Sequence, residues 1–200
     1  MKTYLALGDS YTIGEQVLLS ESFPYQTVQL LRKKNIEITA PEIIAKTGWT
    51  TDDLNAAIQE NIFLKQYDFV SLLIGVNNQY RGRAVEEYET EFNFLLDQAV
   101  ELAGNDSTKV FVLSIPDWSV TAFAKDRDIA KITNEIDEYN ATCKKITLLQ
   151  NCTFIDITTS QRTDVHNPEM LANDGLHPSG KEYTKWAEEL TNNFLTQILQ

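Results

Sequence analysis

Three residues, Ser10, Asp174 and His177, have the types and settings that nucleophilic acyl transfer needs. Ser10 follows a short apolar run, and its hydroxyl is a weak nucleophile until a base removes the proton. His177 could be that base, and Asp174, three residues upstream, could hold the imidazole in one tautomer. A capped helix start carrying a surface histidine explains the same Asp-x-x-His spacing, so the pair alone does not decide the chemistry.

Acyl transfer also needs hydrogen-bond donors directed at the oxygen that becomes negative. Gly48 follows a predicted strand and offers a backbone N–H, while Asn77 follows the next predicted strand and offers a side-chain amide. Taken singly, Gly48 fits a tight turn and Asn77 a loop cap. Because the carboxyl ends of parallel strands share one sheet edge, we expect both residues to lie near Ser10.

Short β-rich apolar runs alternate with longer segments of helical period, which predicts an α/β fold with a parallel sheet covered on both faces. The predicted strands are 3–7, 36–45, 69–74, 110–115 and 153–157. Pro41 restricts the pairing part of the second strand to 42–45. The predicted helices are 23–31, 52–64, 85–102, 129–149 and 183–198. No repeat or flexible linker divides the chain, so we predict a single domain over 1–200.

Four segments in chain order resemble the signature blocks of the SGNH or GDSL hydrolase family, the GDSL-like lipases and esterases. They are Gly8-Asp9-Ser10, Gly48, Gly75-Val76-Asn77 and Asp174-Gly175-Leu176-His177. The resemblance runs from residue 5 to residue 180. It implies a three-layer α/β/α fold with a five-stranded, flavodoxin-like parallel sheet. It also implies a serine ester hydrolase that uses a Ser-His-Asp triad and no metal or organic cofactor.

On the matching positions, the resemblance implies that Ser10 is the nucleophile, His177 the base and Asp174 its partner. The implied oxyanion-hole donors are the N–H groups of Ser10 and Gly48 and the side chain of Asn77. Two positions depart from the family pattern: Tyr11 replaces the usual leucine, and Asn78 replaces an aspartate. Both departures concern substrate class and loop structure more than the proton transfers.

Other residues are candidates for a supporting role. Trp49 and Trp118 could bind substrate, although packing explains large aromatic residues equally well. Weaker candidates for the same role are Tyr80, Arg81 and Phe123. His166 is predicted to be a loop residue, and Asp9 to shape its own turn through its side chain. Two long connections, 116–128 and 158–179, have no predicted element and are expected to form walls of the site.

Two other interpretations of the chain's function remain open. Residues 10–14 resemble a hydroxyl-rich phosphate loop, which would suit a flavin- or phosphate-binding flavodoxin-like module. A catalytically silent interaction domain is the second alternative. The chain lacks the G-x-S-x-G elbow of α/β-hydrolases, the dinucleotide and P-loop glycine patterns, and H-E-x-x-H. These absences argue against the usual dinucleotide, nucleotide and zinc-protease functions.

Charge and hydropathy narrow the partners. A formal net charge of −12 disfavours nucleic acid and anionic membrane surfaces. No apolar run approaches a membrane span, and the N-terminal run is too short for a signal peptide. We therefore expect a cytoplasmic protein, or an exported one if a leader has been removed, with a small-molecule ester as substrate. Lysophospholipids, short-chain acyl esters, acylated carbohydrates and thioesters fit equally, and oligomeric state is not predicted. Cys143 and Cys152 are predicted to be buried thiols.

Overall fold

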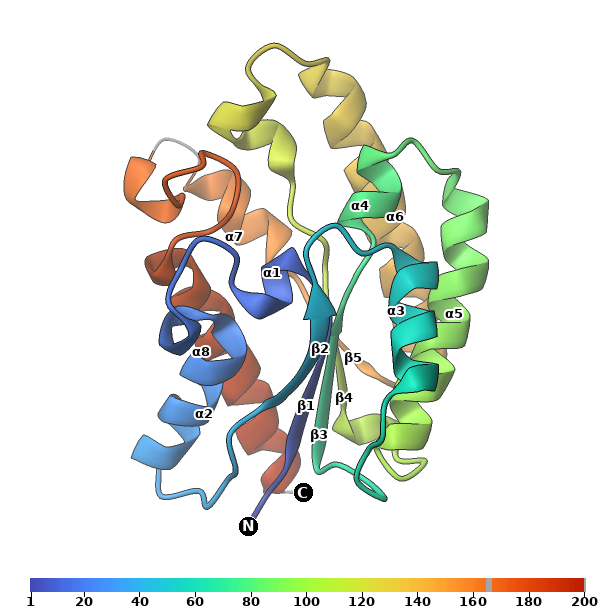
Figure 1. The fold of residues 1–200 in the computed structure, drawn as a ribbon, viewed down its shortest axis with the longest axis vertical. Coiled ribbons are helices and arrows are strands. Elements are labelled where there is room, and N and C mark those ends of the chain that lie inside the picture. The colour runs from blue at the N-terminus through green and yellow to red at the C-terminus, as the bar shows by residue number, and fades with distance from the viewer. Residues whose placement is uncertain (165–166, 200) are drawn as a thin grey trace.

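The structure, a computed structural model, describes residues 1–164 and 167–199. Its centre is a five-stranded sheet in the order β2-β1-β3-β4-β5, and every neighbouring pair is parallel (Figure 1). The strands are β1 (Tyr4–Asp9), β2 (Glu42–Lys46), β3 (Phe69–Leu73), β4 (Val110–Leu113) and β5 (Thr153–Ile155). The order reverses at β1, as in flavodoxin-like sheets, so the crevice at its carboxyl edge is where such folds bind ligands.

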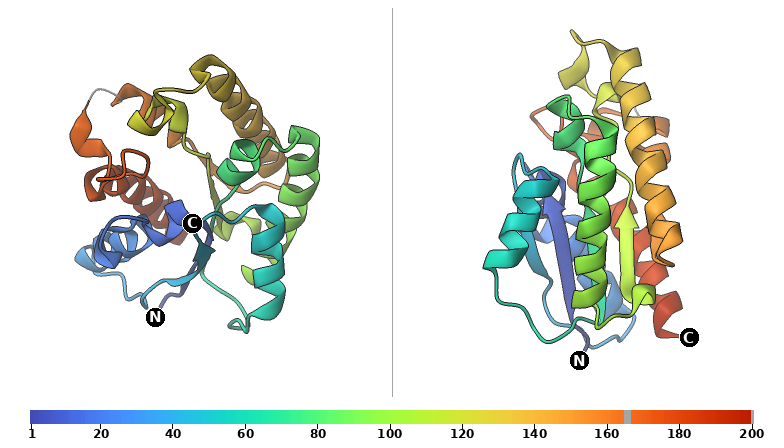
Figure 2. Two further views of the ribbon diagram at one scale, coloured as in Figure 1. Left: turned by 45° about the horizontal axis from the view of Figure 1, so that its top comes forward. Right: turned by 90° about the vertical axis from the view of Figure 1, so that its right-hand side faces the viewer.

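Helices cover both faces of the sheet and complete the three predicted layers. On one face, α2 (Phe23–Lys33) and α8 (Gly180–Ile198) pack against each other. On the other face lie α3 (Thr51–Glu60), α5 (Val85–Leu102) and α6 (Ile129–Leu149), side by side in Figure 2. Each long helix buries one apolar stripe against the sheet, which is why a period of three and four residues predicted them.

Three short helices were not predicted, because a segment of four to six residues is too short to show a helical period. They are α1 (Ser10–Ile13), α4 (Val76–Tyr80) and α7 (Thr158–Thr163). Five single 3₁₀ turns complete the described elements: Leu19–Glu21, Ser107–Lys109, Trp118–Val120, Ala122–Ala124 and Pro168–Met170. The two long connections predicted to lack elements therefore contain short helical turns.

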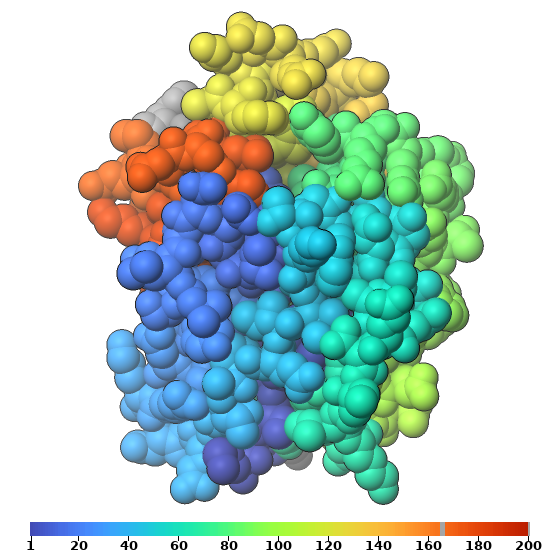
Figure 3. All heavy atoms as spheres, viewed as in Figure 1, coloured from blue at the N-terminus to red at the C-terminus, as the bar shows by residue number. Residues whose placement is uncertain are grey.

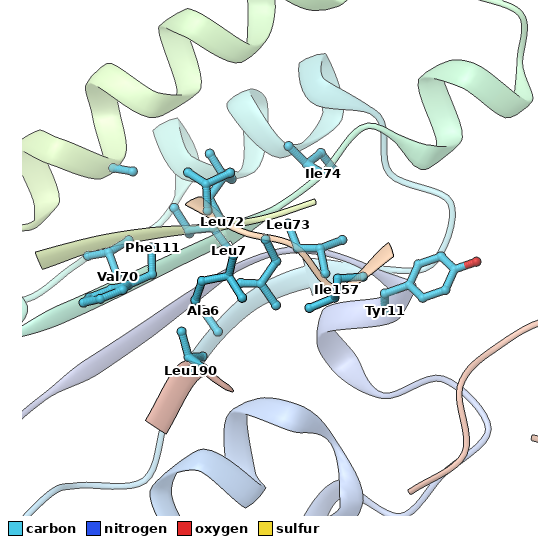
Figure 4. Close-up of a cluster of buried hydrophobic side chains, with 14 of the residues drawn as sticks. Ala6, Leu7, Tyr11, Val70, Leu72, Leu73, Ile74, Phe111, Ile157 and Leu190 are labelled. Carbon is cyan, nitrogen blue, oxygen red and sulfur yellow. The ribbon is translucent and has the colours of Figure 1, made fainter. Parts of the chain in front are cut away.

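The core lies between the sheet and both helix layers. Strand side chains such as Leu7, Leu72 and Phe111 form its centre (Figure 4). Tyr11, on α1, extends this cluster past the strand ends toward the carboxyl edge. The thiol of Cys143 is free and buried, and burial raises its pKa to about 12, consistent with an inert core residue. Within the described residues, no helix has the length and apolarity to cross a membrane.

Candidate active site

Ser10 is the first residue after β1, where the chain turns directly into α1. Asp9 caps this short helix, because its Oδ1 accepts a 3.0 Å hydrogen bond from the backbone N–H of Tyr11. The prediction that Asp9 shapes its own turn is thereby confirmed. Gly8 permits the tight packing, since a Cβ there would lie 2.1 Å from Thr12 Oγ1. The turn holds Ser10, only 4% exposed, at the carboxyl edge of the sheet.

His177 approaches Ser10 from the loop that leads into α8. Its Nε2 lies 3.1 Å from Ser10 Oγ, although 167 residues separate the two along the chain. The other ring nitrogen, Nδ1, lies 2.6 Å from Asp174 Oδ2. Because an ionised carboxylate only accepts hydrogen bonds, Nδ1 carries a proton, and in the neutral imidazole Nε2 then presents its lone pair to the serine hydroxyl. The tilted ring of Tyr11, centred 5.1 Å away, packs beside the imidazole.

Asp174 is held by its own loop as well as by the imidazole. Its Oδ1 accepts 3.0 Å hydrogen bonds from the backbone N–H groups of Leu176 and His177. Partial burial disfavours its charge, but the hydrogen bonds from the His177 ring and from these two N–H groups outweigh that effect and lower the pKa of Asp174. The carboxylate therefore stays ionised at neutral pH.

Gly48 and Asn77 reach the same edge from the ends of β2 and β3. Gly48 has a φ of +82°, a left-handed conformation that glycine adopts without strain, and its carbonyl accepts a 2.6 Å bond from Arg81 Nη2. Asn77, in α4, donates from Nδ2 to the carbonyl of Trp49 at 2.9 Å and to Asp9 Oδ2 at 3.3 Å. These bonds tie the ends of β1, β2 and β3 together around Ser10.

Asn78, which stands where the resembled signature has an aspartate, has a structural role. It is fully buried, and its Oδ1 accepts a 3.1 Å bond from the backbone N–H of Thr51 while its Nδ2 donates to Thr51 Oγ1 at 2.6 Å. The amide thus fastens the start of α3 to α4. Asn78 is not among the residues that line the cleft, whereas its neighbour Asn77 is.

Asp9 is a fully buried carboxyl directly beside the serine. The groups that donate to it, the Tyr11 N–H and the Asn77 amide, are both neutral. Burial raises the pKa of Asp9 to about 7, against the smaller opposing effect of these hydrogen bonds. The turn that carries Ser10 therefore contains a buried carboxyl whose pKa lies near neutral pH.

A cleft of about 210 Å³ opens above Ser10 and His177. Apolar side chains form most of its walls, and the lining residues besides Ser10 and His177 are Tyr11, Thr47, Gly48, Val76, Asn77, Tyr80, Trp118, Phe123 and Leu176. Figure 3 shows the surface hollowed at the upper end of the molecule, where the orange, yellow and green segments meet. The rings of Tyr80 and Trp118 meet edge to face with centroids 5.3 Å apart.

The structure brings together Ser10, His177, Asp174, Gly48 and Asn77, the residues that the sequence indicated. Of the weaker candidates, the cleft is lined by Tyr80, Trp118 and Phe123 but not by Trp49, whose carbonyl binds Asn77 instead. Arg81 turns to the Gly48 carbonyl and to Asp53, 3.8 Å away. His166 lies outside the described residues.

Sequence reasoning missed the lining residues Thr47, Val76 and Leu176. Each of the three is the direct neighbour in sequence of a predicted site residue, and this adjacency is the one signal that could have indicated them. It also missed Gln79, which binds Trp118 from behind the cleft. No pattern in the sequence pairs these two residues, since they come from different segments.

A model of the GDSL-like lipase/acylhydrolase family matches residues 6–185. The chain belongs to this family. As a GDSL-family protein, it is a hydrolase that acts on ester bonds, which argues against the interpretation of residues 10–14 as part of a flavin-binding module. A comparison with curated proteins gives no match.

Solved structures of similar fold cover nearly the whole chain. The lipase/acylhydrolase from Enterococcus faecalis is 19% identical, with a TM-score of 0.78 over 98% of this chain and 97% of that one. A variant of an acetyl xylan esterase from Geobacillus stearothermophilus is 21% identical, with a TM-score of 0.75 over 96% and 94%. The psychrotrophic esterase from Pseudoalteromonas sp., inhibited by monoethylphosphonate, is 15% identical, with a TM-score of 0.72 over the whole of both chains.

Proposed function

We propose that this GDSL hydrolase cleaves short-chain, uncharged acyl esters through a catalytic triad of Ser10, His177 and Asp174. The observation that carries the proposal is the unbroken series of contacts at the cleft floor. Ser10 Oγ lies 3.1 Å from His177 Nε2, and His177 Nδ1 lies 2.6 Å from Asp174 Oδ2. Nucleophile, base and orienting carboxylate are therefore within hydrogen-bond reach before substrate binds.

In the first half of the reaction, Ser10 Oγ attacks the acyl carbonyl carbon while its proton passes to His177 Nε2. The imidazolium that forms is stabilised by Asp174, which keeps its charge throughout. Collapse of the tetrahedral intermediate breaks the bond to the alcohol oxygen, and His177 gives that oxygen the proton. Water then attacks the acyl-serine with the same base, releasing the acid and restoring Ser10.

The oxyanion of the intermediate is proposed to bind the N–H groups of Ser10 and Gly48 and the Asn77 amide. Asn77 Nδ2 already donates to Trp49 and Asp9, so one of its hydrogens has to be shared with the substrate. The longer bond, 3.3 Å to Asp9 Oδ2, is the weaker of the two and is the one expected to yield. Asn77 would then keep its place through the Trp49 carbonyl.

The walls of the cleft support a preference for a short, uncharged substrate. Tyr80, Trp118 and Phe123 supply apolar surface, and no Lys, Arg, Asp or Glu is among the described residues that line the cleft. A volume of about 210 Å³ suits an acyl group of a few carbons better than a long lipid chain. The acetyl xylan esterase of similar fold also supports a small acyl group, here on an alcohol part that we leave open.

Two variants and a matched control test the triad. Ser10→Ala and His177→Ala should fold normally yet lose roughly a thousandfold or more in kcat on p-nitrophenyl acetate, because each removes a member of the proton-transfer pair. A fluorophosphonate probe should label the parent protein and not Ser10→Ala. Replacement of the exposed Ser20 by Ala should leave labelling and rate unchanged. Hydrolysis by Ser10→Ala at the parent rate would show that another residue is the nucleophile.

A further inference from the structure

Trp118 forms one wall of the cleft, and its ring is held from behind by a hydrogen-bond relay. The indole N–H donates to Gln79 Oε1 at 2.7 Å, and Gln79 Nε2 donates to Glu135 Oε2 at 2.8 Å. Gln79 and Trp118 are both at least 95% buried, whereas Glu135 is about one-third exposed. The relay thus links the cleft wall to α6, which lies beside α4 in Figure 1.

The direction of the relay is fixed by chemistry. The Glu135 carboxylate only accepts hydrogen bonds, so the amide nitrogen of Gln79 has to face it. The amide oxygen of Gln79 must then face the indole, whose N–H only donates. A rotation of the Trp118 ring would leave a buried donor and a buried acceptor without partners, which is unfavourable.

The backbone that carries Trp118 is anchored independently of Gln79. Asp117 Oδ1 accepts from the Ser119 N–H at 2.9 Å, and Asp117 Oδ2 accepts from Arg162 Nε at 2.8 Å. The Ser119 hydroxyl lies 2.7 Å from Thr133 Oγ1 on α6. Loss of the relay would therefore release the indole ring while the loop around it stays in place.

The position of the Trp118 ring matters because two other side chains that line the cleft pack against it. Tyr80 and Phe123 both contact Trp118, with centroid distances of 5.3 and 6.0 Å. Gln79 lies between Asn77 and Tyr80 on α4, so one short helix carries an oxyanion-hole candidate, the ring support and a cleft wall. A fixed Trp118 keeps this wall close to Ser10 and limits the size of the group that fits.

We propose that Gln79, oriented by Glu135, is a specificity-determining positioning residue that holds Trp118 in place and thereby limits the acyl or alcohol group that the cleft accepts. This inference rests on the proposed function of the cleft. Gln79 touches neither the reacting atoms nor Ser10, so it acts through Trp118 alone.

The test replaces Gln79 by Met, which has a similar size but offers the indole no oxygen. The ratio of kcat/KM for p-nitrophenyl octanoate to that for the acetate should rise about threefold to tenfold, the effect of one hydrogen bond. The change should lie mainly in KM for the octanoate, and kcat for the acetate should stay within about threefold. Gln98→Met is the matched control. It makes the same change at a glutamine that hydrogen-bonds Asn55 on α3 instead of Trp118, so the ester ratio should not change.

A spectroscopic measurement reports the relay directly. In a ¹⁵N-labelled protein, the indole N–H resonance that is missing from Trp118→Phe identifies Trp118. That resonance should shift in Gln79→Met and in Glu135→Leu, whereas Glu135→Gln, which keeps an acceptor, should leave both the resonance and the ester ratio unchanged. Glu135→Leu should raise the ratio in the same direction as Gln79→Met, and it provides the test if Gln79→Met does not fold.

Three results would overturn the proposal. One is an indole resonance that does not move in the variant, and another is a moved resonance with an unchanged ester ratio. The third is an equal loss of kcat on both esters, which would mean that Gln79 acts through Asn77. Failure of the proposed function would give a different result: the Ser10→Ala protein would still hydrolyse the ester, whatever the Gln79 variants do.

Discussion

Asp9→Asn should change how the stability of this protein depends on pH. Asp9 is fully buried, and burial raises its pKa from 3.8 in the unfolded chain to about 7 in the folded protein. Between these values the folded state keeps the proton and the unfolded state has lost it. The free energy of unfolding therefore falls as pH rises through this window and levels off above about pH 7.

The magnitude follows from the size of the shift. About three pKa units correspond to a total of ~4 kcal/mol, of which the part between pH 5 and pH 8 is ~2.5 kcal/mol. Asparagine cannot ionise, yet it caps a helix as well as aspartate and can still accept from the Tyr11 N–H. Asp9→Asn should thus remove the fall in the free energy of unfolding with rising pH. Any effect of the substitution on the contact with Asn77 should be the same at every pH.

Urea unfolding of both proteins at pH 5, 6, 7 and 8 measures the effect. The stability of Asp9→Asn minus that of the parent should increase by ~2.5 kcal/mol across this range, since the other titrating groups cancel in the difference. Asp52→Asn is the control, because Arg83 helps lower the pKa of Asp52 to about 2 and its titration lies below this range. A difference for Asp9→Asn that stays flat from pH 5 to pH 8 would refute the reasoning.

Two further substitutions test the geometry around Ser10. Gly8→Ala should destabilise by about 3 kcal/mol or more in urea unfolding, because its Cβ would lie 2.5 Å from the Leu73 carbonyl. At Gly82, φ is +69° and the space is open, so alanine there should cost only about 1 kcal/mol, and equal losses would contradict the packing argument. Asn77→Ala should lower kcat on p-nitrophenyl acetate about a hundredfold to a thousandfold with little change in KM. An unchanged kcat would remove Asn77 from the oxyanion hole.

Long periodic segments were the part of the fold that could be predicted closely. The apolar stripe of α5 gave the observed bounds, 85–102, because each turn repeats the same requirement to face the sheet. The second strand was also predicted well, since Pro41 cannot donate to a ladder and pairing with β1 begins at Glu42. Such signals are local and need no knowledge of the neighbours.

The short elements around the cleft could not be predicted in this way. Helix α4 spans five residues, too few for a period, and contacts from distant segments help to hold it, such as the bond from Gln79 to Glu135 on α6. Trp118 lies in a connection that was predicted to have no element, and a 3₁₀ turn capped by Asp117 places it at the cleft.

The sequence by itself determined which residues could take part: a serine directly after the first strand, and an Asp174 carboxylate spaced to reach the ring of a histidine three residues on. Only the tertiary structure decided that His177 and Ser10 meet across 167 residues. It also decided that Asn77 is held by the Trp49 carbonyl, and that Trp118 is fixed from behind by Gln79. The physical reason is that a turn is specified by its own residues, whereas a contact between loops depends on the sheet that brings their ends together.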